Sequence, residues 1–136
     1  MAVFLLLAGC NTLDWQVFEL TYSGGCDNDE ALELIADRIV SALSNEGFEC
    51  ESDFGHDDIH SSCFIEDADW GIQATGTFVW TRYPDEDGRI PVWVRTTSTA
   101  FHPFGPSKKY NRKWVDLMTR IINSIDDVTS VRREID

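Results

Sequence analysis

Two stretches of the 136-residue chain repeat apolar residues at the period of an α-helix, and this pattern constrains the fold more than any other feature. In residues 28–46 the apolar positions are Leu32, Ile35, Ala36, Ile39 and Leu43, and in residues 108–125 they are Trp114, Leu117, Met118, Ile121, Ile122 and Ile125. Each set forms a stripe along one side of its helix. Each helix therefore has to bury that side against another element.

The residues around the two stretches are typical of helix ends. Asp27 is followed three residues later by Glu30, as in a capping box with Asp in place of Ser or Thr. Gly47 is a suitable stop for the first helix. Ser107 can cap the second.

The rest of the chain contains segments that alternate polar and apolar residues or lie between turn residues. These segments predict strands at residues 15–22, 48–54, 59–66, 70–83 and 90–101. The last two flank a turn-forming run, residues 84–88. On their expected apolar face we place Ile72, Ala74, Phe78 and Trp80 with Ile90, Val92 and Val94, and on the other face Gln73, Thr75, Thr77 and Thr81 with Trp93, Arg95, Thr97 and Thr99.

The predicted order is strand, helix, four strands, helix. A sheet with one apolar face is the natural place to bury two striped helices. We therefore expect an α+β fold, a two-layer sandwich in which a mostly antiparallel sheet of about five strands carries two helices on one face. A single domain covers residues 15–136.

The first residues of the chain are apolar and end in a short motif. Residues 2–7 are all apolar, and they lead into Leu7-Ala8-Gly9-Cys10. This motif resembles the lipobox of bacterial lipoproteins, with small residues at the cleavage position. The alternative is a buried first strand at residues 3–8, with Cys10 as a core thiol.

The resemblance implies that residues 1–9 are a cleaved signal peptide and that Cys10 is lipidated, with residues 10–14 as a short tether. Acyl chains on Cys10 would hold the protein on an envelope membrane. Asn11 is not the Asp that retains lipoproteins in the inner membrane. The resemblance therefore favours the outer membrane, facing the periplasm, with the membrane itself as one partner.

Three further cysteines fit an oxidising compartment. Cys50 and Cys63 are equidistant from a predicted turn at residues 55–58. In a hairpin of that register they lie opposite each other, close enough for a disulfide. The alternatives are that Cys26 pairs with one of them or that no bridge forms.

The net charge of −13 argues against nucleic acid as a partner, because phosphate backbones would repel such a protein. No apolar run reaches the length of roughly 20 residues that a membrane-spanning helix needs. Basic residues gather at Lys108, Lys109, Arg112 and Lys113. They either neutralise acids elsewhere in the molecule or face anionic lipid headgroups or an acidic partner.

Signals for catalysis are weak. His56, Asp58 and His60, with Asp53 and Asp57 nearby, are candidate metal ligands, but such residues are equally suited to a solvated turn. The acids at residues 27–30 lack the pattern of a calcium loop. The chain has no nucleophile motif and no phosphate-binding glycine loop. We therefore expect no catalytic residue, metal or cofactor.

One sheet face is the candidate binding surface, with Trp93, Arg95, Tyr83, Thr97 and Thr77, because aromatic residues and Arg are enriched in interface cores. The alternative is an ordinary solvated face. The leading hypothesis is a non-enzymatic, lipid-anchored envelope protein that binds or helps to assemble another envelope component through the face or the edge of its sheet. The second is a periplasmic inhibitor or small-ligand-binding module that uses residues 102–106, and the third is a metal-dependent enzyme.

Overall fold

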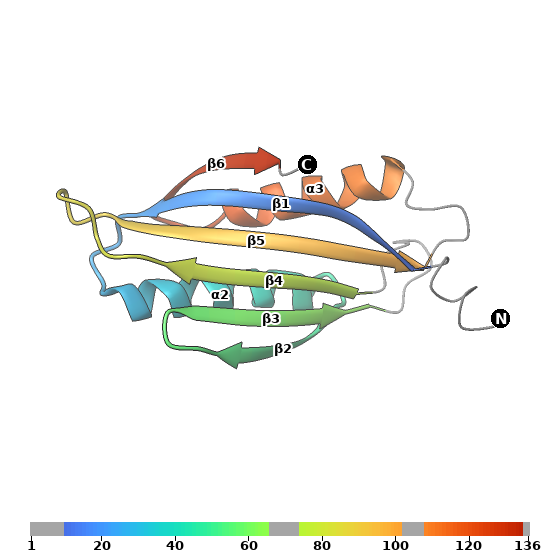
Figure 1. Cartoon of the computed structure of the whole chain (residues 1–136), viewed down its shortest axis with the longest axis horizontal. Coiled ribbons are helices and arrows are strands. Elements are labelled where there is room, and N and C mark those ends of the chain that lie inside the picture. Colours follow the sequence, from blue (N-terminus) through green and yellow to red (C-terminus); the bar gives the residue numbers. More distant parts are fainter. Residues whose placement is uncertain (1–9, 66–73, 102–107, 135–136) are drawn as a thin grey trace.

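The computed structural model describes residues 10–65, 74–101 and 108–134. The elements in these ranges are β1 (Cys10–Tyr22), α2 (Asn28–Asn45), β2 (Glu49–Phe54), β3 (Asp58–Phe64), β4 (Ala74–Thr81), β5 (Ile90–Phe101), α3 (Lys108–Asn123) and β6 (Val128–Glu134). The strands form one sheet in the order β2-β3-β4-β5-β1-β6, and every neighbouring pair is antiparallel. Both helices lie behind this sheet in Figure 1. The predicted α+β sandwich is confirmed.

The two helices match their sequence patterns closely. The Asp27 side chain accepts a hydrogen bond of 2.9 Å from the Glu30 backbone N–H, as expected for an N-cap. Gly47, with φ at 101°, follows the end of α2 in the left-handed conformation that favours glycine. All the apolar positions predicted for the two stripes are buried. Ile125 belongs to this core although α3 ends before it.

The sheet is more extensive than the sequence predicts. Strand β6 was not expected; it pairs with β1 from Tyr22↔Val128 to Gln16↔Glu134. Strand β1 begins at Cys10 and not at Trp15, so residues 10–14 continue the strand, with a register shift between Thr12 and Trp15. The presence of β6 and the early start of β1 both depend on pairing with neighbouring strands. The alternation of apolar residues along the sequence does not reveal that pairing.

The core lies between the helices and the face of the sheet that they cover, here called the inner face. The strands contribute Phe18, Leu20, Tyr22, Ile59, Cys63, Val79, Ile90, Val92 and Val94 to it. Because side chains alternate along a strand, the residues between these positions point to the opposite side, here called the outer face. In the view of Figure 1 the outer face is the near one.

The predicted orientation of β4 is wrong. Val79 pairs with Val94 and is buried, and Trp80 pairs with Trp93 on the outer face. Phe78 is therefore outward as well, whereas the threonines of the strand are buried at the inner face: Thr75, Thr77 and Thr81. The register with β3 and β5 decides the orientation, because β4 lies between two strands whose apolar residues already face the helices.

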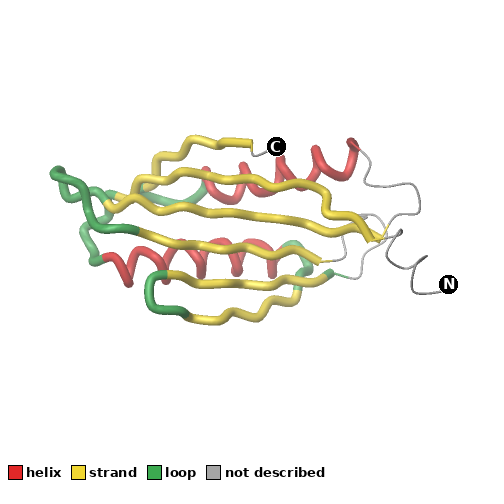
Figure 2. The backbone as a smooth tube through the Cα atoms, viewed as in Figure 1, coloured by secondary structure: helices red, strands yellow, loops and turns green. Residues whose placement is uncertain are grey.

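The two ends of the sheet differ in what they contain. The turns at residues 23–27, 55–57 and 82–89 lie at the end opposite to Cys10 (Figure 2). Hydrogen bonds connect the residues at this end with each other and with the segment after α3. The Asn28 side-chain amide donates to Arg82 O at 2.7 Å, and the Thr81 backbone N–H donates to Asp57 O at 3.4 Å. The Ser23 backbone N–H donates to Asp127 O at 3.0 Å. We call this the distal end.

Several sequence-based expectations lie outside the described residues. These are the signal peptide at residues 1–9, the positions of Ile72 and Gln73, the cap at Ser107 and the loop at residues 102–106. No helix in the described ranges has the length and apolar character needed to cross a membrane.

Candidate functional site: the outer face of the sheet

Partly exposed aromatic side chains cross the outer face of the sheet. Trp80 of β4 and Trp93 of β5 are a cross-strand pair whose rings stack with centroids 6.0 Å apart and planes inclined by 16°. The guanidinium carbon of Arg82 lies 5.3 Å from the centre of the Trp93 ring. Such cation–π contacts and ring pairs hold long side chains in one arrangement.

The row continues from Trp80 towards β3. Phe78 packs against Trp80 with centroids 5.4 Å apart, and the His60 ring lies 6.3 Å from Phe78. The guanidinium carbon of Arg95 is 6.0 Å from the centre of the Phe78 ring. We call these six residues the aromatic–arginine row: His60, Phe78, Trp80, Arg82, Trp93 and Arg95.

The row combines ordered aromatic rings with polar side chains. Its aromatic rings are held by one another, so little side-chain entropy remains to be lost on binding. Phe78, Trp80 and Trp93 are half-buried, and Arg82, Arg95 and His60 are exposed. The surface therefore combines apolar ring edges with N–H donors, the composition that is typical of interface cores.

A groove of about 580 Å³ lies beside the row. The side chains along it on the outer face are those of Glu49, Glu51, Ser62, Phe64 and Thr97. Gly76 leaves space at the base of the groove, where an added Cβ would lie 3.6 Å from Thr97 Oγ1 and 3.8 Å from His60 Nε2. Polar groups and one exposed ring thus surround an open depression.

Three of the five residues predicted for the binding surface lie together on the outer face. Trp93, Arg95 and Thr97 lie on the outer face, and Tyr83, which is 89% exposed, is in the turn that follows β4. Thr77 does not belong to this surface. It is 1% exposed on the inner face, because the orientation of β4 is the reverse of the one predicted.

Four members of the row are not predicted for this surface from the sequence. Phe78 and Trp80 are expected in the core, His60 is considered only as a metal ligand, and Arg82 is not singled out. The signal that could have found them is the hairpin register. The pairs Trp80↔Trp93 and Thr81↔Val92 place the two tryptophans opposite each other across residues 82–91. Hydrophobicity alone assigns Phe78 and Trp80 to the core, and that assignment hid the row.

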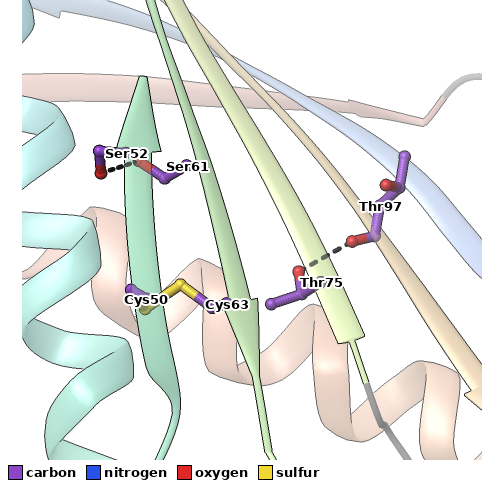
Figure 3. The surroundings of a disulfide bond; sticks show 6 residues. All are labelled: Cys50, Ser52, Ser61, Cys63, Thr75 and Thr97. Carbon is purple, nitrogen blue, oxygen red and sulfur yellow. Dashed lines mark hydrogen bonds between the residues drawn. A yellow bond between two sulfur atoms is a disulfide. The ribbon is translucent and has the colours of Figure 1, made fainter. Parts of the chain in front are cut away.

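The predicted disulfide is confirmed. Cys50 and Cys63 are directly paired in the β2–β3 hairpin and are bonded, with their Cα atoms 4.1 Å apart (Figure 3). Ser52 and Ser61, the next pair along, share a hydrogen bond of 2.8 Å. Cys26 is a free thiol.

The free thiol lies against a buried tyrosine. A hydrogen bond with Cys26 raises the pKa of the Tyr22 hydroxyl above its ordinary value of 10.0, and burial and nearby carboxylates raise it further. The neutral phenol is therefore the favoured form in the folded protein.

The candidate metal ligands do not assemble. His60 packs on Phe78, whereas His56 is exposed in the turn between β2 and β3. Within the described ranges, no three His, Cys, Asp or Glu side chains are grouped so that they could hold a metal ion.

Comparison with known proteins adds no assignment. No protein-family model and no curated protein matches the sequence.

Proposed function

We propose that the chain is a non-enzymatic binding module, held on a bacterial envelope membrane by lipid on Cys10, that engages another envelope component through the outer face of its sheet. The observation that carries the proposal is the aromatic–arginine row. It lies on the face of the sheet that the helices leave uncovered, and its rings are already ordered by mutual contact.

The arrangement of charge along the sheet supports the membrane anchor. The distal end carries acids in each of its turns: Asp27, Asp57, Asp85, Glu86, Asp87, Asp126 and Asp127. The basic start of α3, from Lys108 to Lys113, lies towards the same end as Cys10 (Figure 1). Anionic headgroups attract basic residues and repel acidic ones, so this polarity suits a protein whose Cys10 end faces a membrane.

The length of β1 sets the reach of such a module. The strand has 13 residues, which at about 3.3 Å per residue extend roughly 40 Å. The distal turns would therefore be held well beyond the headgroups, with the outer face directed sideways and accessible to a neighbouring protein.

The anchor is tested by intact-mass spectrometry on the product of the full gene, expressed in a bacterial host and separated into membrane and soluble fractions. We expect a membrane-bound species that begins at Cys10 and carries the mass of the acyl groups. A soluble species that retains residues 1–9 would overturn the anchor.

The binding face is tested separately by photo-crosslinking in cells. A photoreactive amino acid replaces Trp93 in one variant and Asp116, which is exposed on α3, in the control. We expect a discrete crosslinked product at position 93 and none at position 116, and an excess of the Arg95→Ala protein should not compete for it. Equal crosslinking at both positions would contradict the proposal.

A further inference from the structure

Strand β2 is an open edge of the sheet. It pairs with β3 on one side only, and the order β2-β3-β4-β5-β1-β6 puts no described strand on the other. The strand has six residues, all exposed except the half-buried Cys50. Proteins usually protect an edge with charged side chains, especially lysine, or with proline, a bulge or a covering segment. Residues 49–54 contain no lysine, no proline and no register shift, so the acidic side chains of Glu49, Glu51 and Asp53 are the protection that this strand itself carries.

The register shows which backbone groups of β2 are available. In an antiparallel pair, hydrogen-bonded and non-hydrogen-bonded residue pairs alternate. The Gly55 N–H donates to Asp58 O at 2.8 Å, so the residues of β2 in phase with Gly55, namely 49, 51 and 53, direct their N–H and C=O groups to β3. The N–H and C=O groups of Cys50, Ser52 and Phe54 therefore point to the open side.

Grooves flank this edge on both faces of the sheet. The groove on the outer face, described above, includes Glu49 and Glu51. A second groove of about 610 Å³ lies between the end of β2 and the exposed side of α2. It is lined by Glu30, Glu33, Leu34, Asp37, Arg38 and Phe54, and the Phe54 ring is 70% exposed.

The charge around the edge has one dominant sign. Six exposed carboxylates surround it, from Glu49, Glu51 and Asp53 on β2 and from Glu30, Glu33 and Asp37 on α2. Among the residues that line the α2 groove, Arg38 is the single cation. Within the described part of the chain, none of the six carboxylates forms a hydrogen bond or an ion pair through its side chain.

From these observations we propose that the β2 edge binds an extended, basic segment of a partner protein as an added strand. The segment pairs with the backbone of Cys50, Ser52 and Phe54, and its alternate side chains enter the two grooves. Its lysine or arginine side chains meet the carboxylates on both sides, and an apolar side chain covers Phe54. This site is distinct from the aromatic–arginine row and does not depend on a lipid at Cys10.

The test uses the full-length protein and a labelled peptide of about eight residues that alternates lysine with threonine or valine. We expect saturable binding that weakens as salt is raised, because exposed charges are screened. Replacement of the lysines by glutamate should abolish binding, as should N-methylation of the peptide backbone on its paired side. Equal binding of the basic and acidic peptides, or no binding of the basic one, would overturn the proposal.

One substitution isolates the edge. The N–H of Ser52 points to the open side, so Ser52→Pro removes an edge donor without removing a backbone hydrogen bond to β3. Ser52→Ala is the matched control: both variants lose the bond to Ser61, but the alanine keeps the N–H. We expect at least a roughly tenfold loss of affinity for Ser52→Pro and less than about a twofold change for Ser52→Ala.

A second variant tests the β2 edge even if the proline variant does not fold. Glu51→Gln with Asp53→Asn changes only exposed side chains and should weaken the basic peptide while reducing the salt dependence of its binding. Trp93→Ala should leave peptide binding unchanged, which separates this site from the proposed function. Unchanged affinity for the basic peptide in both Ser52→Pro and the Glu51→Gln, Asp53→Asn variant would overturn the proposal.

Hydrogen exchange gives the most direct readout. Bound peptide should slow exchange at the amides of Cys50, Ser52 and Phe54, whereas the amides of Glu51 and Asp53 are already protected by β3. Protection without this alternation would place the peptide elsewhere. Concentration-dependent self-association that Ser52→Pro abolishes would identify a second copy of the chain as the occupant and overturn the peptide proposal.

Discussion

The inner and outer faces of strand β4 reverse the usual distribution of side chains. The inner face buries Thr75, Thr77 and Thr81 beneath the helices, whereas the outer face leaves Phe78 and Trp80 partly exposed. Neighbouring strands impose this arrangement, because β3 and β5 present their apolar residues to the helices and β4 must follow their register. Strand pairing, and not the hydrophobicity of the strand itself, decides which face is covered.

The reversal leaves a row of polar residues across the inner face. Paired positions run from Ser52 through Ser61, Thr77 and Thr96 to Gln16 on β1. The Ser52 and Ser61 hydroxyls bond each other, but in the described structure the hydroxyls of Thr77 and Thr96 lack a hydrogen-bond partner. Burying an unpaired hydroxyl costs stability, so each of these two threonines should stabilise the fold less than an apolar side chain of the same shape would.

Removal of a tryptophan from each side of the sheet should give the largest contrast in the free energy of unfolding. Trp114 of α3 is fully buried beside Phe48, and Trp114→Ala should lower the free energy of unfolding by about 3–5 kcal/mol. Trp93→Ala removes ring contacts on the outer face and should cost about 1–2 kcal/mol. Denaturant unfolding measures both variants, and equal losses would contradict the distinction between the faces.

Loss of the disulfide should have the next largest effect on the free energy of unfolding. The bridge joins residues 13 apart, and replacing both Cys50 and Cys63 with alanine should cost about 2–3 kcal/mol. Hydrogen exchange should speed up most in β2, because the bridge ties this edge strand to the buried side of β3. Cys26→Ser, which keeps the bridge, is the control. A uniform increase in exchange over all strands would show that the bridge does not act locally.

Two threonines on the inner face of β4 should respond in opposite directions to the same substitution. Thr75 donates a hydrogen bond of 2.8 Å to Thr97 O, so Thr75→Val should lower the free energy of unfolding by about 1 kcal/mol. Thr77 has an unpaired buried hydroxyl, so Thr77→Val should raise it by up to about 1 kcal/mol. Thermal and denaturant unfolding test the signs, and a loss in both variants would refute the account of the polar row.

The smallest effect on the free energy of unfolding is expected from the ionisation of Tyr22 at high pH. The pKa of Tyr22 in the folded protein is raised above 10.0, so the unfolded chain ionises first. The resulting stabilisation is complete below pH 10.0 and is lost as the pH rises from there through the folded-state pKa. Tyr22→Phe should therefore lose less stability than the parent over this range, as measured by urea midpoints. Parallel losses would argue against the shift.

The sequence predicts the structure best where the interactions are local. The stripes of both helices, the Asp27 cap and the Cys50–Cys63 pair all follow from residues close together in the chain. The orientation of β4 and the existence of β6 depend on partners far away. In β6, Val128 and Val131 are the only apolar residues, and the strand exists because the backbone of β1 is available to pair with it.

The same difference between local and long-range interactions applies to the candidate site. Trp93 and Arg95 were identified by residue type, and the structure places them on the outer face as expected. Thr77 was assigned to the wrong face, and Phe78 and Trp80 were assigned to the core, because their positions depend on the pairing of β4 with β5. The β2 edge had no signal in hydrophobicity, because the pattern of apolar residues does not show which strand lies at the end of the sheet order.

The position of β1 within the sheet determines when folding can be completed. This first strand pairs with β5, up to Cys10↔Phe101, and with β6, up to Gln16↔Glu134. Helix α2 and the β2–β3 hairpin can form while the chain is being synthesised, but β1 has no neighbour until the last third has emerged. Such long-range pairing slows folding. A chain that emerges from the ribosome N-terminus first therefore leaves β1 unpaired until β5 has been synthesised.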